Sequence, residues 1–593
     1  MSKMQTKLDY ADAIADWFLD ICDRHIGKGD FENALKSAHV AATILCRQNR
    51  TLASPRIEAA LHVVAEHLSH DISLPKVPAE KGDKSVCLHV MDEALRAGGL
   101  TAMAIRWMRN DQSGRIHSVA LLSQDVPIPD DLRDAVRTRR GNIYTADPAA
   151  SFLQRARWLK KLAHESADYV ILHIGVADVI AGVAFGADGG PPVMLVNHAA
   201  HIFWTGVSIA DLVVNCRGSA LETFWTSIYR DARCATVPIP LVDPNPFGDQ
   251  SQQCRADKRE AKEAIGVPSD ATVILTVGAW YKYLPVDGLD FVETMQGVVQ
   301  EVPEAFLLVV GFHADSRWNQ ASARAGDRIR ALGIVSQDQL AAIHQAADVY
   351  VEGFPVGSTS ALLEAGLQGI PVVLGPSPSP PPYTTDGVAL DNTLDRATSI
   401  SDYKHKIVQL SRNHLERHSC GSGIRAAIGC HHTGDGWRQY LETALKMLPP
   451  RHSVRAAVTP VPTPVTVHEY WSAFVAQNNS KYEETLEHAV IRALQIGLRP
   501  RLTKTVMQAC RDYSAVRRRL SMPLPLLFLL CNCLLPLLPL KLAQAAFRLS
   551  AFLCRPSALQ RLRAHFHAIL RGRAASRSWY EEYRNARAKT DDS

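Results

Sequence analysis

The sequence predicts an α/β protein with two doubly wound domains and helical extensions at both ends. Apolar strand patterns alternate with amphipathic helical stretches from residue 83 to about 375, which favours crossover units and parallel sheets. A proline-rich segment at 236–249 divides this alternation into two series. The length of 593 residues also requires several domains, because single cores stop growing at about 250–300 residues.

The elements follow in order along the chain. Segments 30–47 and 54–68 place apolar residues at helical spacing, and Ser54-Pro55 is a helix start signal. Strand candidates of the first series are 85–90, 117–123, 168–178 and 191–201, with a Gly-Gly turn opening a helix at 96–108. In the second series, strands are predicted at 272–280, 305–312, 348–354 and 370–375, and helices at 258–267, 292–302, 336–347 and 358–369. The predicted division is a helical region at 1–82, doubly wound domains at 83–245 and 246–448, a proline-rich linker at 449–468 and a basic, apolar helical tail at 469–593.

Charge is distributed unevenly along the chain. Residues 499–593 hold 18 Lys or Arg and 5 Asp or Glu, a balance of +13, so the other 498 residues carry 47 basic and 55 acidic side chains. A basic tail on an acidic body suggests an anionic surface as partner. The uncharged run 521–540 contains four prolines, so we expect shallow insertion at a membrane interface, or packing on the protein, rather than a spanning helix. Because its arginines are interleaved with leucines, nucleic acid is the poorer partner.

The scattered cysteines and the polar start of the chain indicate a cytoplasmic protein with reduced thiols. One group, Cys420 with Cys430, His431 and His432, has the residue types of a zinc site. Its spacing fits no common ligand pattern, so no metal site is predicted.

The stretch YVEGFPVGSTSALLEAGLQGIPVV, residues 350–373, has the features of an anion site. A buried strand ends in Gly357, which permits close backbone approach, and Ser358, Thr359 and Ser360 then cap a helix. The free amides and dipole at that helix start favour a phosphate. Glu364, one turn in, can accept hydrogen bonds from ribose hydroxyls. An ordinary capped helix is the alternative.

A second feature supports the anion site. The segment VILTVGAWYKYLP (273–285) ends a strand with Gly278, and Tyr281-Lys282 follow it. A lysine just beyond the carboxyl end of a strand can reach phosphate oxygens, although a single lysine is often only solvated. In consecutive doubly wound domains a ligand is expected in the cleft between them, at the carboxyl ends of the strands.

Residues 255–375 resemble the donor domain of GT-B glycosyltransferases, which have two Rossmann-like domains. GVPSDATVILTVGAWYK and AADVYVEGFPVGSTSALLEAGLQGIPVV are similar to the polysaccharide glycosyltransferases with a Glu-x7-Glu motif and to the O-GlcNAc-transferase-like group. The resemblance implies that Lys282 binds the diphosphate, the Ser358–Ser360 amides bind phosphate and Glu364 binds ribose. Val356 stands where the first group has its first Glu, and Glu352 is near but out of register, which favours the second group or a divergent branch.

The first series offers other candidates. Gly98-Gly99 stands where GT-B enzymes shape a loop toward phosphate or acceptor, and a structural turn is the alternative. An inverting enzyme needs a general base, for which His is suited near neutral pH. His201 is the predicted base or leaving-group contact, with His198 and His173 as rivals, and a structural role is the alternative for each.

The predicted function is transfer of a sugar from a nucleoside-diphosphate donor, with UDP favoured, to a glycan, lipid-linked or protein acceptor. Lys282 and the helix start would stabilise the leaving group without a metal or another cofactor. A sugar-nucleotide epimerase of the same architecture and a catalytically degenerate scaffold or membrane adaptor are the alternatives.

Overall fold

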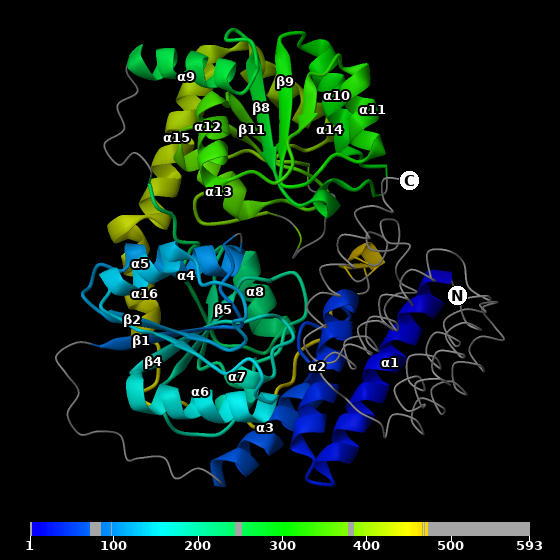
Figure 1. Cartoon of the computed structure of the whole chain (residues 1–593). Coiled ribbons are helices and arrows are strands. Elements are labelled where there is room, and N and C mark those ends of the chain that lie inside the picture. The colour runs from blue at the N-terminus through cyan, green and yellow to red at the C-terminus, as the bar shows by residue number, and fades with distance from the viewer. Residues whose placement is uncertain are drawn as a thin grey trace, which may run out of the picture.

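The computed structural model describes residues 3–70, 85–96, 98–243, 252–286, 288–376, 383, 385–464, 466–467 and 469–471 (Figure 1). Three helices open the chain: α1 (Lys3–Ile26), α2 (Phe31–Gln48) and α3 (Pro55–His70). Their apolar faces share one core with the first sheet and its helices. The carboxylate of Glu58 on α3 is buried and accepts the backbone amides of Gly206 (2.9 Å) and Ser208 (3.0 Å), which fixes the helices to that domain.

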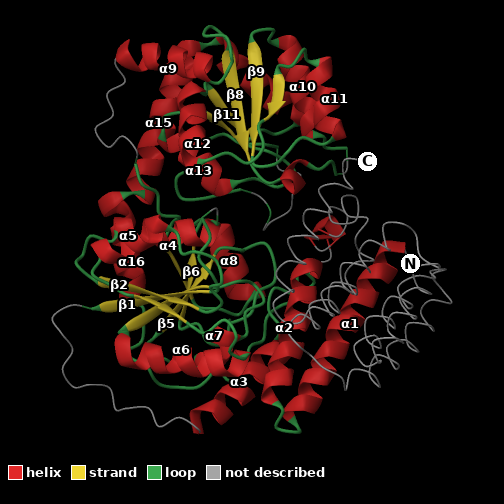
Figure 2. Cartoon of the chain, in the orientation of Figure 1, coloured by secondary structure: helices red, strands yellow, loops and turns green. Residues whose placement is uncertain are grey.

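The first sheet has seven parallel strands in the order β3-β2-β1-β4-β5-β6-β7. The strands are β1 (Val86–Met91), β2 (Ile116–Leu121), β3 (Ile143–Thr145), β4 (Tyr169–His173), β5 (Val193–Asn197), β6 (Leu212–Asn215) and β7 (Cys234–Thr236). Its helices are α4 (Gly99–Asn110), α5 (Asp130–Thr138), α6 (Phe152–Ser166), α7 (Ile180–Ala184) and α8 (Ala220–Tyr229). Strands β4, β5 and β6 are buried throughout, as expected where helices cover both faces of a parallel sheet (Figure 2).

The second sheet has five parallel strands in the order β10-β9-β8-β11-β12. The strands are β8 (Thr272–Val277), β9 (Ala305–Val310), β10 (Ile329–Ala331), β11 (Val349–Val351) and β12 (Val372–Val373). Its helical elements are α9 (Gln252–Ala264), the short 3-10 helix η1 (Trp280–Tyr283), α10 (Phe291–Glu301), α11 (Ser316–Arg324), α12 (Gln337–Ala346), α13 (Thr359–Leu367) and α14 (Ile400–Arg412). The strand order reverses between β8 and β11, and such switch points are where doubly wound sheets bind ligands.

The last helices return to the first domain. Helix α15 (His414–His432) packs on the second domain, whereas α16 (Gly434–Lys446) lies next to the first domain (Figure 1). Trp437 of α16 lies edge-on to Trp107 of α4, with ring centroids 5.2 Å apart. The segment after α16 also lies on the first domain and on the N-terminal helices. His452 contacts Asp211 at 2.7 Å, and Thr463 donates a hydrogen bond to the carbonyl of Asn49 at 2.8 Å.

The predicted interfacial segment 521–540 and the rest of the basic tail beyond residue 471 lie outside the described residues. Within the described part of the chain, no helix has both the length and the apolar character needed to cross a membrane.

Candidate functional site

Lys282 and the start of α13 meet at the switch point of the second sheet. Lys282 lies in η1, directly after β8, and α13 follows β11, the neighbouring strand. The Lys282 ammonium donates a hydrogen bond to the carbonyl of Gly357 at 2.6 Å. Because an ammonium carries three donors, this contact leaves capacity for an anion. The structure thus brings together the two parts that sequence reasoning placed around one phosphate.

The surroundings of Lys282 weaken its hold on its proton. Burial lowers the pKa of Lys282 to about 8, and the nearby carboxylate of Glu352 opposes that shift. A pyrophosphate beside the ammonium would favour the charged form further. When no ligand is bound, the Lys282 ammonium therefore has a pKa only slightly above neutral pH.

The start of α13 departs from the predicted capping. Ser358 is the N-cap residue, but its side chain makes no capping hydrogen bond, while Thr359 and Ser360 form the first helical turn. Of these, Ser360 is exposed and the other two are partly exposed. The prediction that serine and threonine hydroxyls cap this helix is wrong for Ser358. First-turn amides of a helix have no intrahelical partner, so the position suits an anion.

Two glycines allow the backbone to approach closely at this point. A Cβ built on Gly278 would lie 2.8 Å from Ser358 Oγ and 2.9 Å from the Tyr283 hydroxyl. A Cβ built on Gly357 would lie 2.1 Å from both Glu352 Oε1 and Thr385 Oγ1. Both predicted glycine positions are therefore packed against other parts of the site.

We expect Gly357→Ala to impair both folding and ligand binding. The added methyl overlaps a buried carboxylate, so the Gly357 carbonyl that holds Lys282 must shift. Overpacking of this kind costs about 1–3 kcal/mol, which urea unfolding of purified protein would measure. The control is Gly423→Ala on α15, where a Cβ meets nothing within 4 Å and the change should be neutral or stabilising. Equal stabilities for the two variants would contradict the packing argument.

Glu352 belongs to this site although its sequence register differs from the Glu-x7-Glu pattern. It follows β11, is buried, and accepts the amide of Gly375 at 2.8 Å and the guanidinium of Arg396 at 3.4 Å. Burial raises the pKa of Glu352, and Arg396 opposes that shift. Its carboxylate lies behind Gly357 and beside Lys282, so it supports the backbone turn.

Glu364 connects the two domains. Its carboxylate forms an ion pair with Arg106 of α4 at 2.5 Å, and both side chains are partly buried. A carboxylate has two oxygens and about four acceptor sites, so the pair leaves room for ribose hydroxyls.

The positions of Gly98, Gly99 and Tyr281 give weaker support for a role in the site. Gly98 is the N-cap of the same helix α4, and a Cβ on Gly99 would meet nothing within 4 Å, so no contact requires glycine at 99. Tyr281 is 37% exposed and lies edge-on to Trp280.

The three candidate histidines occupy different surroundings. His201 follows β5, and its ring lies edge-on to Tyr383 and Trp471, with centroids 6.1 Å away in each case. Burial and the positive charges of Lys282 and Arg217 lower the pKa of His201 to about 3, which makes it a weak base in the ligand-free protein. His198 is exposed and contacts the carbonyl of Val196 at 3.4 Å. His173 is buried in β4, hydrogen-bonded to His89, and therefore belongs to the core.

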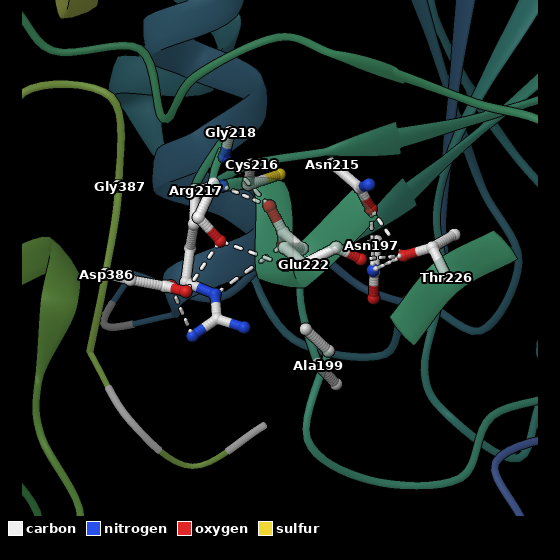
Figure 3. Close-up of polar contacts among 12 residues, drawn as sticks. Asn197, Ala199, Asn215, Cys216, Arg217, Gly218, Glu222, Thr226, Asp386 and Gly387 are labelled. Atoms are coloured by element: carbon white, nitrogen blue, oxygen red, sulfur yellow. Dashed lines mark hydrogen bonds and ion pairs between the residues drawn. The ribbon is translucent and has the colours of Figure 1, made fainter. Parts of the chain in front are cut away.

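An ion-pair cluster that was not predicted from the sequence joins the two domains (Figure 3). Its Arg217 is one of the positive charges that lower the pKa of His201. Arg217, in the loop after β6, pairs with Asp386 of the second domain at 2.8 Å, and Ser219 donates a hydrogen bond to the same carboxylate at 2.6 Å. Glu222 accepts the amides of Arg217 and Gly218 at 2.8 and 2.9 Å. Burial raises the pKa of both Glu222 and Asp386, and Arg217 opposes each shift.

Part of this cluster has a sequence signal. Ser219-x-x-Glu222 after an apolar strand is the pattern of a capped helix start, and Ser219 does accept the amide of Glu222 at 2.9 Å. The pairing with Asp386 has no such signal, because the two residues come from different domains.

The side chains of Cys420, Cys430, His431 and His432, which were considered as zinc ligands, do not point to one common position. Cys420 and Cys430 are exposed on α15, His431 contacts the hydroxyl of Tyr440 at 2.9 Å, and His432 contacts the carbonyl of Ile239 at 2.8 Å.

A comparison with protein families finds one match, and it lies in the second domain. Residues 271–413 match the family described as Glycosyl transferases group 1, a range that runs from β8 into α14. The two parallel sheets confirm the predicted α/β class with two doubly wound domains, and the family match in the second domain agrees with the predicted resemblance to GT-B glycosyltransferases.

Several solved structures are similar to the chain. HepE from Anabaena, solved in complex with UDP and glucose, is 14% identical with a TM-score of 0.45, covering 61% of this chain and 99% of HepE. The Thermobaculum terrenum O-GlcNAc transferase is 12% identical with a TM-score of 0.40, covering 82% of this chain and 85% of the transferase. TarM from S. aureus is 11% identical with a TM-score of 0.43, covering 61% and 99%. No curated protein matches the sequence.

Proposed function

We propose that this protein transfers a sugar from a nucleoside-diphosphate sugar, with UDP favoured, to a hydroxyl of a glycan, lipid-linked or protein acceptor, as in polysaccharide assembly. The observation that carries the proposal is the contact between the Lys282 ammonium and the Gly357 carbonyl at the start of α13. It places a cation and free helix amides at one point of the switch region, which is the arrangement that a pyrophosphate leaving group requires.

The bond to the anomeric carbon breaks as the acceptor oxygen attacks, and negative charge then grows on the pyrophosphate. Lys282 and the first amides of α13 would stabilise that charge without a metal in the transfer step. Glu364 would hold the ribose. Burial is the main cause of the lowered pKa of His201, and the charges of Lys282 and Arg217 add to it. In the loaded site the diphosphate would offset these charges, which would raise the basicity of His201 for proton removal from the acceptor.

A panel of UDP, GDP and ADP tests the donor site. We expect one nucleotide to raise the thermal unfolding midpoint of the full chain and the other two to have smaller effects, because ligand binding to the folded state stabilises it. A sugar conjugate of the nucleotide that stabilises the protein should then be hydrolysed slowly or serve as donor in transfer. If none of the three nucleotides raises the midpoint, a catalytically degenerate scaffold or membrane adaptor is favoured. If the sugar is epimerised without transfer, a sugar-nucleotide epimerase is favoured.

The basic tail also bears on where the protein acts in the cell. We infer a cytoplasmic protein that contacts an anionic membrane surface through its basic tail, residues 499–593. Sedimentation of the full chain with vesicles of phosphatidylserine, compared with vesicles of phosphatidylcholine, tests this inference.

A further inference from the structure

Three buried histidines form a row across the first sheet, apart from the site described above. His173 on β4, His89 on β1 and His117 on β2 are all fully buried on neighbouring strands. His89 Nδ1 lies 3.0 Å from His173 Nε2, and His89 Nε2 lies 2.9 Å from His117 Nδ1. A row of buried imidazoles is unusual for a core that otherwise consists of apolar side chains, because each ring needs polar partners.

A thiol faces two of these rings. Cys87 precedes His89 by two residues on β1, so both side chains lie on the same face, and Cys87 is opposite His117 in the parallel register with β2. Cys87, His89 and His117 each offer one ligand atom, and these atoms all lie within 4.8 Å of one another. One thiol and two imidazoles are the donor set that suits Zn²⁺.

A carboxylate orients the nearer ring. Asp111, at the end of α4, contacts His117 Nε2 at 3.1 Å and accepts the hydroxyl of Ser113 at 2.6 Å. Asp111 also pairs with the guanidinium of Arg115 at 3.1 Å, so all of these neighbours are placed to donate hydrogen bonds to its carboxylate. It therefore accepts the proton of His117 Nε2, which leaves the lone pair of Nδ1 directed at His89. A carboxylate on the outer nitrogen is the usual support of a metal-ligating histidine.

The charge around the histidines and a hydroxyl next to the thiol also favour a cation at this place. Arg115 pairs with Asp111 at 3.1 Å and with Glu442 at 2.5 Å, so these three side chains carry one net negative charge beside the histidines. A divalent cation with a thiolate adds one positive charge and balances it. Tyr169 stands opposite Cys87 on β4, and its buried hydroxyl interacts with the Cys87 thiol.

We propose that Cys87 Sγ, His89 Nε2 and His117 Nδ1 bind a structural zinc ion, with the Tyr169 hydroxyl nearest to the fourth position. Binding would displace the thiol proton of Cys87 to solvent, and the two ring nitrogens would separate from 2.9 Å to about 3.4 Å to fit tetrahedral geometry. Because the ligands are fully buried, the ion would enter during folding and take no part in sugar transfer. It would join β1 to β2.

Metal analysis of the full chain, produced without an affinity tag that binds metal, tests the proposal. We expect about one zinc per chain in the wild type and less than about a tenth of that in Cys87→Ser. The matched control is Cys216→Ser, which changes a second buried thiol in the same domain and should keep the metal. Zinc that is absent from the wild type, or retained equally by Cys87→Ser, would overturn the proposal.

Cobalt provides a second measurement that does not depend on expression conditions. Wild-type protein refolded with Co²⁺ should show a thiolate-to-cobalt charge-transfer band in the near ultraviolet, with the visible bands of a tetrahedral site. Cys87→Ser should lose the ultraviolet band, and Cys216→Ser should retain it. A wild-type spectrum without either band would mean that the histidines form only a hydrogen-bonded row anchored on Asp111.

Discussion

Lys282→Ala should reduce sugar transfer by about 100- to 1000-fold, the effect of removing one preorganised group that stabilises the transition-state charge. The ammonium is held at Gly357, beside the α13 amides, where the leaving pyrophosphate is proposed to lie. Its removal leaves the helix amides to hold that charge alone. Steady-state transfer with the nucleotide-sugar identified by the thermal panel measures the loss, which we expect mainly in kcat.

Tyr283→Phe is the matched control for Lys282→Ala. Tyr283 is the next residue, is fully buried among aromatic rings, and its hydroxyl contacts that of Thr276 at 3.1 Å. The phenylalanine keeps the ring packing and loses one hydrogen bond, worth about 1 kcal/mol of stability, so transfer should change only a few-fold. Equal activities for the two variants would contradict the role of Lys282.

The pH profile gives an independent check of the same residue. Because the pKa of Lys282 is lowered to about 8, the free protein loses this positive charge as pH rises through 8, so kcat/KM should fall there. Lys282→Arg keeps its charge to much higher pH, and its profile should lack that decline. A decline that persists unchanged in Lys282→Arg would assign the titration to another group.

The alternation of strand and helix could be predicted from the sequence because the spacing of apolar residues within each segment indicates its secondary structure. Buried parallel strands such as 272–277 are continuous apolar runs, and glycine and serine mark where they end. The meeting of Lys282 with α13 followed from the same logic, since the carboxyl ends of neighbouring parallel strands share one edge.

Contacts that depend on strand order or on the second domain could not be predicted in this way. The pairs Arg106–Glu364 and Arg217–Asp386 join residues of different domains, and only the packed structure brings them together. The row of His173, His89 and His117 needs the order β4-β1-β2 and its register, which no local pattern specifies. Val356, which stands in the register position of the missing Glu, is buried, while Glu352 reaches the site from the end of β11.

Arg217→Ala should destabilise the protein by about 3–5 kcal/mol, because it leaves the buried carboxylates of Asp386 and Glu222 without their cation. The expected readout is a lower midpoint in thermal and urea unfolding. Since burial already raises the pKa of both carboxyls, their protonation relieves the cost, and the stability deficit should shrink as the pH is lowered below neutrality.

The control for this prediction is Arg137→Ala, which breaks an ion pair with Asp134 whose side chains are 81% and 58% exposed. An exposed pair contributes about 0–1 kcal/mol, so that variant should resemble the wild type. The double variant Arg217→Met with Asp386→Asn removes both charges and should recover much of the lost stability, because the large cost comes from leaving one charge unpaired. If Arg217→Ala were as stable as Arg137→Ala, the cluster would not hold the two domains together, and the electrostatic effect of Lys282 on His201 would depend on other contacts between the domains.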